Sequence, residues 1–197
     1  MRSLVAALTA TALLLAGCAA APAPTAPTAP PTTGESQGED VTAFLARHDL
    51  SGLPVQDIVE RLDAGQDDRK DGPVGSVRPA ELLLSDGEGE VALPIPDGEF
   101  YLAFAPYRTR THECYNHNLA TCSGELQGQE LHVRVVDATG ATLVDEQLTT
   151  HANGFAGVWL PRDITGTLTV THDGDTASVP IATGPADRTC LTTLKLG

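Results

Sequence analysis

The second half of the chain alternates apolar and polar side chains in short segments, and this pattern constrains the fold most. Leu131, Val133 and Val135 face one way, and the polar residues between them face the other. Side chains on a strand point alternately to its two faces, so the pattern predicts strands with one buried face. Turns containing glycine separate these segments at regular spacing. We therefore expect residues 99–197 to form an antiparallel β-sandwich of immunoglobulin or transthyretin type.

The preceding residues, 40–98, combine helical patterns with a hairpin. Asp40 is a capping residue at the start of a short helix. Apolar residues within 55–62 then recur at i, i+3, i+4 and i+7, which is the stripe of a second helix. Alternating apolar residues on both sides of Ser85–Gly87 predict a β-hairpin. The chain is thus expected to be α+β, with a small helix-plus-hairpin domain before the sandwich.

The amino-terminal residues have the features of an export signal. A charged start leads into an apolar run that is short for a membrane span, and Leu15–Cys18 (LAGC) is typical of a bacterial lipobox. Residues 18–39 are rich in alanine, proline and threonine, which predicts a disordered tether. We expect a signal peptide at 1–17, lipid on the Cys18 thiol, and an extracytoplasmic protein that only this lipid holds at the cell membrane. The alternative is an ordinary secretory signal with an incidental cysteine.

The overall charge narrows the choice of partners. The formal net charge is −14 at pH 7. Such an acidic surface argues against nucleic acid, and against docking on anionic lipid other than through the anchor.

The cysteines are the residues best suited to metal binding or redox chemistry. Export places them where disulfides form. With Cys18 on lipid, Cys114, Cys122 and Cys190 remain, and an odd number leaves one thiol over after any disulfide. Cys114 and Cys122 lie in a long loop between predicted strands, and such loops are usually functional or fastened down. Cys190 and Leu194 are an even number of positions apart, so in a strand their side chains point to the same face. This predicts that Cys190 points inward and meets Cys114 and Cys122.

Three interpretations of this cluster stay open at the level of spacing. The first is a metal site, in which His112 and His117 flank Cys114; thiolate and imidazole ligands suit Cu(I) and Zn(II). Cu(I) needs only the three sulfurs, whereas Zn(II) takes a fourth ligand from one histidine. The second is a Cys114–Cys122 disulfide, with Cys190 as a buried apolar residue. The third is thiol–disulfide exchange, although no Cys-x-x-Cys pair is present.

Four motifs together resemble the CueP family of periplasmic copper-binding proteins, over about Phe44 to Leu196. They are Phe100-Tyr-x-x-Phe-Ala-Pro-Tyr107, Thr111-His-x-Cys-x-x-His-x-Leu-x-Thr-Cys122, Asn153-Gly-Phe…Trp159-Leu-Pro-Arg-Asp163 and Thr189-Cys-Leu-Thr-Thr-Leu194. The resemblance implies copper ligation by Cys114, Cys122 and Cys190, with His112 and His117 nearby.

The resemblance also implies a biological setting. It implies a role in copper resistance, a small N-terminal domain linked to homodimerisation, and an exported Cu,Zn superoxide dismutase as a recipient of copper. The lipobox and tether depart from a freely diffusing periplasmic protein. We therefore expect a lipid-anchored protein, not an enzyme, that sequesters or hands on Cu(I), with Zn(II) as the second metal. The alternatives are a thiol–disulfide oxidoreductase and a disulfide-stapled β interaction module.

Overall fold

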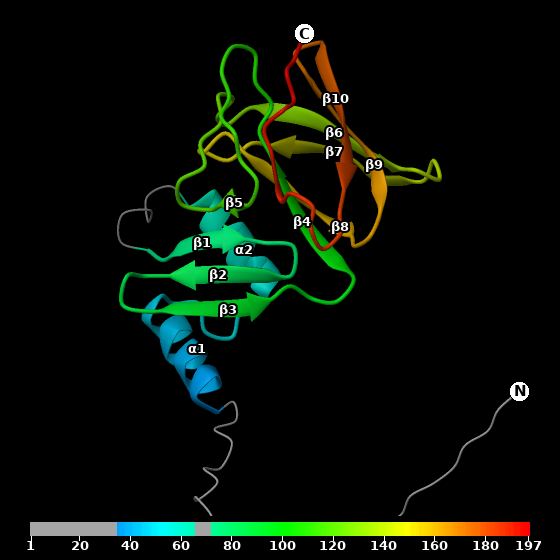
Figure 1. The fold of residues 1–197 in the computed structure, drawn as a ribbon. Helices are drawn as coiled ribbons and strands as arrows, with labels where there is room; N and C mark the ends of the chain where they lie inside the picture. Colours follow the sequence, from blue (N-terminus) through cyan, green and yellow to red (C-terminus); the bar gives the residue numbers. More distant parts are fainter. Residues whose placement is uncertain (1–34, 66–71) are drawn as a thin grey trace, which may run out of the picture. The chain divides into compact units, whose positions relative to one another are not determined.

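Two helices begin the part of the chain that the structure describes. α1 spans Glu35–Arg47 and α2 spans Val55–Ala64 (Figure 1). Pro54 precedes α2, where its fixed φ and missing N–H fit a helix start. Ile58 and Val59 are buried, as the predicted stripe requires. α1 begins earlier than the predicted start at Asp40, so this boundary was wrong.

The computed structural model describes residues 35–65 and 72–197, with side chains from residue 41 onward. The predicted signal peptide, Cys18 and most of the predicted tether lie outside these residues. Within them, no helix has the length and apolar character needed to cross a membrane.

The first sheet contains the predicted hairpin and two strands that we did not predict. Its order is β3-β2-β1-β5 (Figure 1). The strands are β1 (Val74–Val77), β2 (Glu81–Ser85), β3 (Glu90–Pro94) and β5 (His117–Asn118). β5 pairs antiparallel with β1, so that His117 lies opposite Val77. The long loop that carries two cysteines therefore supplies the fourth strand of a sheet built mainly from residues before 98.

The remaining strands form two further sheets, with orders β10-β9-β6-β7 and β11-β4-β8. Their bounds are β4 (Glu99–Phe104), β6 (Glu130–Asp137), β7 (Thr142–Thr149), β8 (Ala156–Pro161), β9 (Thr165–His172), β10 (Asp175–Ala182) and β11 (Cys190–Leu191). Apolar side chains from both sheets share one core. The α+β class is confirmed, whereas the immunoglobulin or transthyretin type stays a prediction. One pairing departs from the antiparallel expectation, because β11 runs parallel to β4.

β4 is buried on both faces and separates two apolar cores. Phe100 and Leu102 belong to the core between the two C-terminal sheets. Tyr101 and Ala103 belong to a second core, which also contains residues of both helices, the first sheet and the cysteine loop. A strand buried on both faces needs a continuous apolar run, which explains this segment of the sequence. Apolar packing therefore crosses the predicted boundary at residue 98, and the division into two domains stays a prediction.

Candidate metal centre

Cys190 is placed by the parallel pairing of β11 with β4. It lies opposite Ala103, is 0% exposed, and belongs to the same core as Ala103. Leu194 and Leu196 pack in the other core. The inward position agrees with our expectation, but the shared parity was wrong, because β11 ends at Leu191 and alternation does not continue beyond it.

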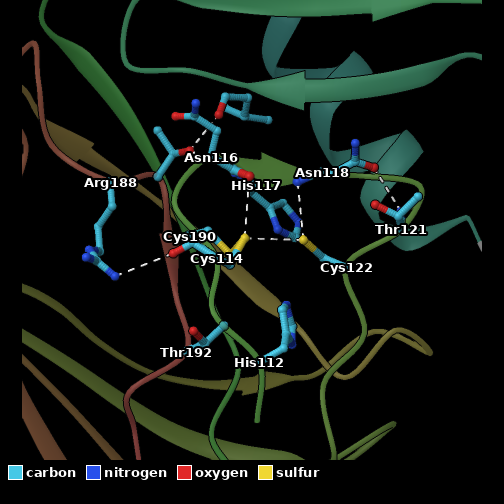
Figure 2. Close-up of a disulfide and its surroundings, with 12 residues drawn as sticks. His112, Cys114, Asn116, His117, Asn118, Thr121, Cys122, Arg188, Cys190 and Thr192 are labelled. Carbon is cyan, nitrogen blue, oxygen red and sulfur yellow. Dashed lines mark hydrogen bonds between the residues drawn. A yellow bond between two sulfur atoms is a disulfide. The ribbon is translucent and has the colours of Figure 1, made fainter.

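Cys114 is brought to Cys190 by backbone hydrogen bonds. The carbonyl oxygen of Tyr115 accepts the N–H groups of Thr189 at 3.0 Å and of Cys190 at 3.1 Å. The Cα atoms of Cys114 and Cys190 are 5.6 Å apart, and their sulfurs form a disulfide (Figure 2). The Cys114–Cys122 disulfide considered from the sequence is therefore the wrong pairing, because β11 docks against the residue that follows Cys114.

Cys122 is the free cysteine of the described chain, and a tight turn holds it beside the disulfide. Its N–H donates to the carbonyl oxygen of Asn118 at 3.1 Å. The Asn118 N–H donates back to the Cys122 sulfur at 3.4 Å, which helps to fix the position of this sulfur. The Sγ of Cys122 is 3.4 Å from the Sγ of Cys114, so the three sulfurs lie together (Figure 2).

His117 lies on β5 with its side chain 0% exposed. Its Nε2 is 2.9 Å from Oδ1 of Asp63, while its Nδ1 is buried without a hydrogen-bond partner. Burial alone would lower the pKa of His117, but the hydrogen bond to Asp63 and the neighbouring Cys122 raise it to about 9. The His117 ring also packs against an apolar side chain, because its centroid lies 4.7 Å from the centroid of the Phe155 ring.

Asp63 lies in the last turn of α2, buried in the core, where it accepts hydrogen bonds from three side chains. Besides His117, they are the Tyr101 hydroxyl at 2.8 Å and the Asn153 amide at 2.7 Å. Burial opposes ionisation of Asp63, but the hydrogen bond from His117, with those from Tyr101 and Asn153, lowers its pKa. The same burial, with the charge of Asp63, raises the pKa of Tyr101 well above its ordinary value. A charged carboxylate is thus stabilised inside the protein.

Two overlapping sets of ligand atoms result from this geometry. His117, Cys122 and Cys190 have ligand atoms within 4.8 Å of one another, and so do His112, Cys114 and Cys122. Cys122 is common to both. The first set is buried, whereas His112 and Cys114 line a surface cleft of about 720 Å³. All five residues predicted for the site are therefore close together, with the two histidines in different surroundings.

The ligand chemistry depends on the state of the disulfide. Once Cys114 and Cys190 are reduced, the centre offers three sulfurs and a buried imidazole, a donor set for Cu(I) or Zn(II). Metal–sulfur bonds of about 2.3 Å bring ligand sulfurs to roughly 3.5–4 Å of one another. The Cys114–Cys122 separation of 3.4 Å is close to this range.

Comparison with known proteins identifies the family. The model of the family described as periplasmic copper-binding protein CueP matches residues 57–195. The chain belongs to the CueP family. A solved crystal structure described as that of S.CueP is 46% identical to the chain and has a TM-score of 0.77; the match covers 80% of this chain and 97% of that chain. A search of curated proteins finds no match.

Membership of the CueP family confirms the resemblance seen in the sequence and fits a copper-binding protein. Sequence reasoning missed Asp63, Tyr101 and Asn153, which surround His117. Asp63 stands in a helical segment where acidic residues are common, and its partners lie 38, 54 and 90 positions away. The only local signal was that Asp63 follows Leu62, at the buried edge of the apolar stripe of α2.

Proposed function

We propose that this protein binds Cu(I) through Cys114, Cys122 and Cys190, with His117 as a further ligand, and that it sequesters copper or hands it on outside the cytoplasm. The observation that carries the proposal is the convergence of three sulfurs and a buried imidazole in a member of a copper-binding family. Cu(I) is soft and is satisfied by three sulfurs. Holding the ion inside the protein keeps it from peroxide, which supports a role in copper resistance.

The disulfide adds a redox step to this proposal. In the oxidised protein only Cys122 is free among the three cysteines. An external dithiol can supply two electrons and two protons, becoming a disulfide itself and converting the Cys114–Cys190 bond to two thiols. Each thiol then loses its proton when it binds the metal. In the opposite direction, two Cu(II) ions can each take one electron from these thiols, which yields two Cu(I) ions, the disulfide and two protons.

The location of the protein and its partners are proposed from the sequence. Lipid on Cys18 would hold the protein at the cell membrane, with residues 18–39 as a tether. An exported Cu,Zn superoxide dismutase is the proposed recipient, and the segment 40–98 is proposed to support a homodimer. No substrate turnover is needed for capture and transfer, so we propose a binding protein and not an enzyme.

A thiol–disulfide oxidoreductase is the second candidate, and one contact favours it. The Cys122 thiol lies 3.4 Å from a sulfur of the disulfide, so it can attack Cys114 and release the thiol of Cys190. However, Cys190 is 0% and Cys122 only 6% exposed, which leaves Cys114 as the accessible sulfur for a partner protein. This burial suits retention of an ion better than exchange with a protein.

The two functions are separated by one measurement. The full chain is purified without air, and its free thiols and bound metal are counted before and after addition of one equivalent of Cu(I). The proposed function predicts three reactive thiols in the reduced domain that become unreactive when Cu(I) binds with 1:1 stoichiometry. Unprotected thiols, together with rapid reduction of disulfides in a test substrate, would favour the oxidoreductase.

A further inference from the structure

A carboxylate on α2 makes direct contact with the candidate metal centre. Asp63 is 0% exposed, although an isolated charge in a protein interior is costly. Its oxygens offset this cost by accepting hydrogen bonds from Tyr101, His117 and Asn153. Tyr101 contacts Oδ2, while His117 and Asn153 share Oδ1. The carboxylate is therefore held from several sides, and its position is fixed.

The two nitrogens of His117 have different surroundings. Nε2 is 2.9 Å from Asp63, which as a carboxylate only accepts, so Nε2 carries the hydrogen. Nδ1 is buried without a hydrogen-bond partner. The raised pKa of His117 favours a ring protonated on both nitrogens at neutral pH, so a metal ion displaces the hydrogen of Nδ1 when it binds. Nε2 then keeps its hydrogen and Nδ1 holds the lone pair, in a ligand cluster that His117 shares with Cys122 and Cys190. Figure 2 shows the ring beside the sulfurs.

We propose that Asp63 is a positioning residue of the metal centre: it fixes the His117 imidazole with hydrogen on Nε2 and directs the lone pair of Nδ1 at the sulfur cluster. This inference rests on the proposed function. Histidines that bind metals commonly donate their other N–H to a carboxylate, which orients the ring and makes it a stronger ligand. A residue of the N-terminal segment thereby completes the surroundings of a site carried by later parts of the chain.

The competing explanation is that Asp63 serves only to attach α2. Tyr101→Phe provides a matched control, because it removes one hydrogen bond to the same carboxylate without touching Nε2 of His117. Asp63→Asn keeps the size of the side chain and an acceptor oxygen but removes the charge. A purely structural carboxylate would make both changes alter stability and leave the metal affinity unaltered.

The test is a double-mutant cycle on the reduced full chain, with Zn(II) as the probe and Cu(I) in parallel. Chelator competition gives the affinity of the wild type, D63N, Y101F, H117A and the D63N/H117A double variant. D63N is expected to weaken Zn(II) binding by about 10–100-fold. In the H117A background it should weaken binding by less than about threefold, since the two residues then no longer interact. Equal losses in both backgrounds, or no loss in either, would overturn the role of Asp63.

A second readout needs no metal. In the metal-free wild type, NMR should detect a His117 Nε2 proton that exchanges slowly, and D63A should lose it while Y101F keeps it. Absence of this proton from the wild type would overturn the inference even if copper binds. Failure of the wild type to bind Cu(I) or Zn(II) would overturn the proposed function and this inference together. A wild-type site that binds normally and shows no coupling to Asp63 would overturn the inference alone.

Discussion

The Sγ of Cys122 lies 3.4 Å from the Sγ of Cys114, which is bonded to Cys190. Cys122 is also the residue common to both sets of candidate ligands. We therefore expect Cys122→Ser to nearly abolish tight Cu(I) binding by the reduced protein. His117→Ala should weaken Cu(I) binding by about 10–100-fold, because a trigonal Cu(I) ion retains its three sulfurs.

Competition against a Cu(I) chelator under reducing conditions measures both variants. For Zn(II), the loss in His117→Ala should be greater than for Cu(I), since a tetrahedral ion requires the fourth ligand. Equal losses of Cu(I) affinity in the two variants would make His117 as essential as a sulfur and contradict a three-sulfur site.

His112 should act in exchange of the ion more than in its retention. It lines the surface cleft with Cys114, whereas His117 is buried behind the sulfurs. We expect His112→Ala to slow transfer of Cu(I) between a chelator and the protein while changing the affinity less than His117→Ala does. Stopped-flow transfer rates and equilibrium competition on the same samples provide the comparison. A larger affinity loss in His112→Ala than in His117→Ala would reverse this assignment.

The disulfide should stabilise the metal-free protein, and Cu(I) should replace it. Cys114 and Cys190 are separated by 76 positions, so the bond closes a long loop. Its reduction without metal is expected to lower the free energy of unfolding by about 2–5 kcal/mol. Cu(I) should recover much of this loss, because its bonds to both sulfurs close the same loop. Urea titrations measure the change, with a Cys114→Ser/Cys190→Ser variant as the control that reductant must leave unchanged.

Glu125 should make the loop before Cys114 sensitive to acid. The hydroxyl and N–H of Thr109, with the N–H groups of Arg110 and Arg108, lower the pKa of Glu125 from 4.5 to about 2. Because the folded protein depresses this pKa, the stabilising effect is present above pH 4.5 and is lost as the pH falls towards 2. Glu125→Gln should remove this contribution to the pH dependence of unfolding.

Measuring the unfolding midpoint from pH 6 to pH 2, in steps of about half a pH unit, checks that Glu125 loses its stabilising effect as the pH falls. Glu146→Gln, on the exposed side of β7, is the matched control for the loss of one negative charge. If the two variants follow the same curve, the hydrogen bonds of Glu125 are not responsible for the acid sensitivity.

The lipid anchor should be separable from metal binding. We expect mass spectrometry of membrane fractions to find a diacylglycerol-modified Cys18 at the mature amino terminus. A Cys18→Ser variant should be released from the membrane yet bind Cu(I) with the wild-type affinity, because all the proposed ligands lie at residue 112 or later. An unmodified terminus cleaved at another position would rule out the lipoprotein.

Local sequence patterns were enough for much of the fold. The apolar stripe of α2 and the hairpin of β2 and β3 depend on neighbouring residues, so their periodicity is visible in the sequence. β1 and β5 were missed because they are short and depend on each other across a distance in the chain. β11 was predicted too long because apolar residues beyond Leu191 keep the alternation while packing in another core.

The candidate site shows the same limit. The cysteines and histidines could be selected from the sequence, since few other residues bind soft metals. The choice of disulfide partner could not, because spacing favours the nearby Cys122 whereas the pairing follows from β11 docking on Tyr115. Asp63 could not be selected either, because its burial depends on side chains from β4, β5 and the turn before β8.

The parallel strand β11 has a consequence for a chain that emerges from a translocation channel amino terminus first. Cys114 and Cys122 leave the channel long before Cys190, which follows 76 positions after Cys114. Until β11 pairs with β4, a nascent chain exposes the thiols of Cys114 and Cys122 without that of Cys190 and without the strand that packs beside them. We therefore expect the proposed copper site to be completed late, in the same step that completes this sheet, and unfinished chains to retain copper poorly.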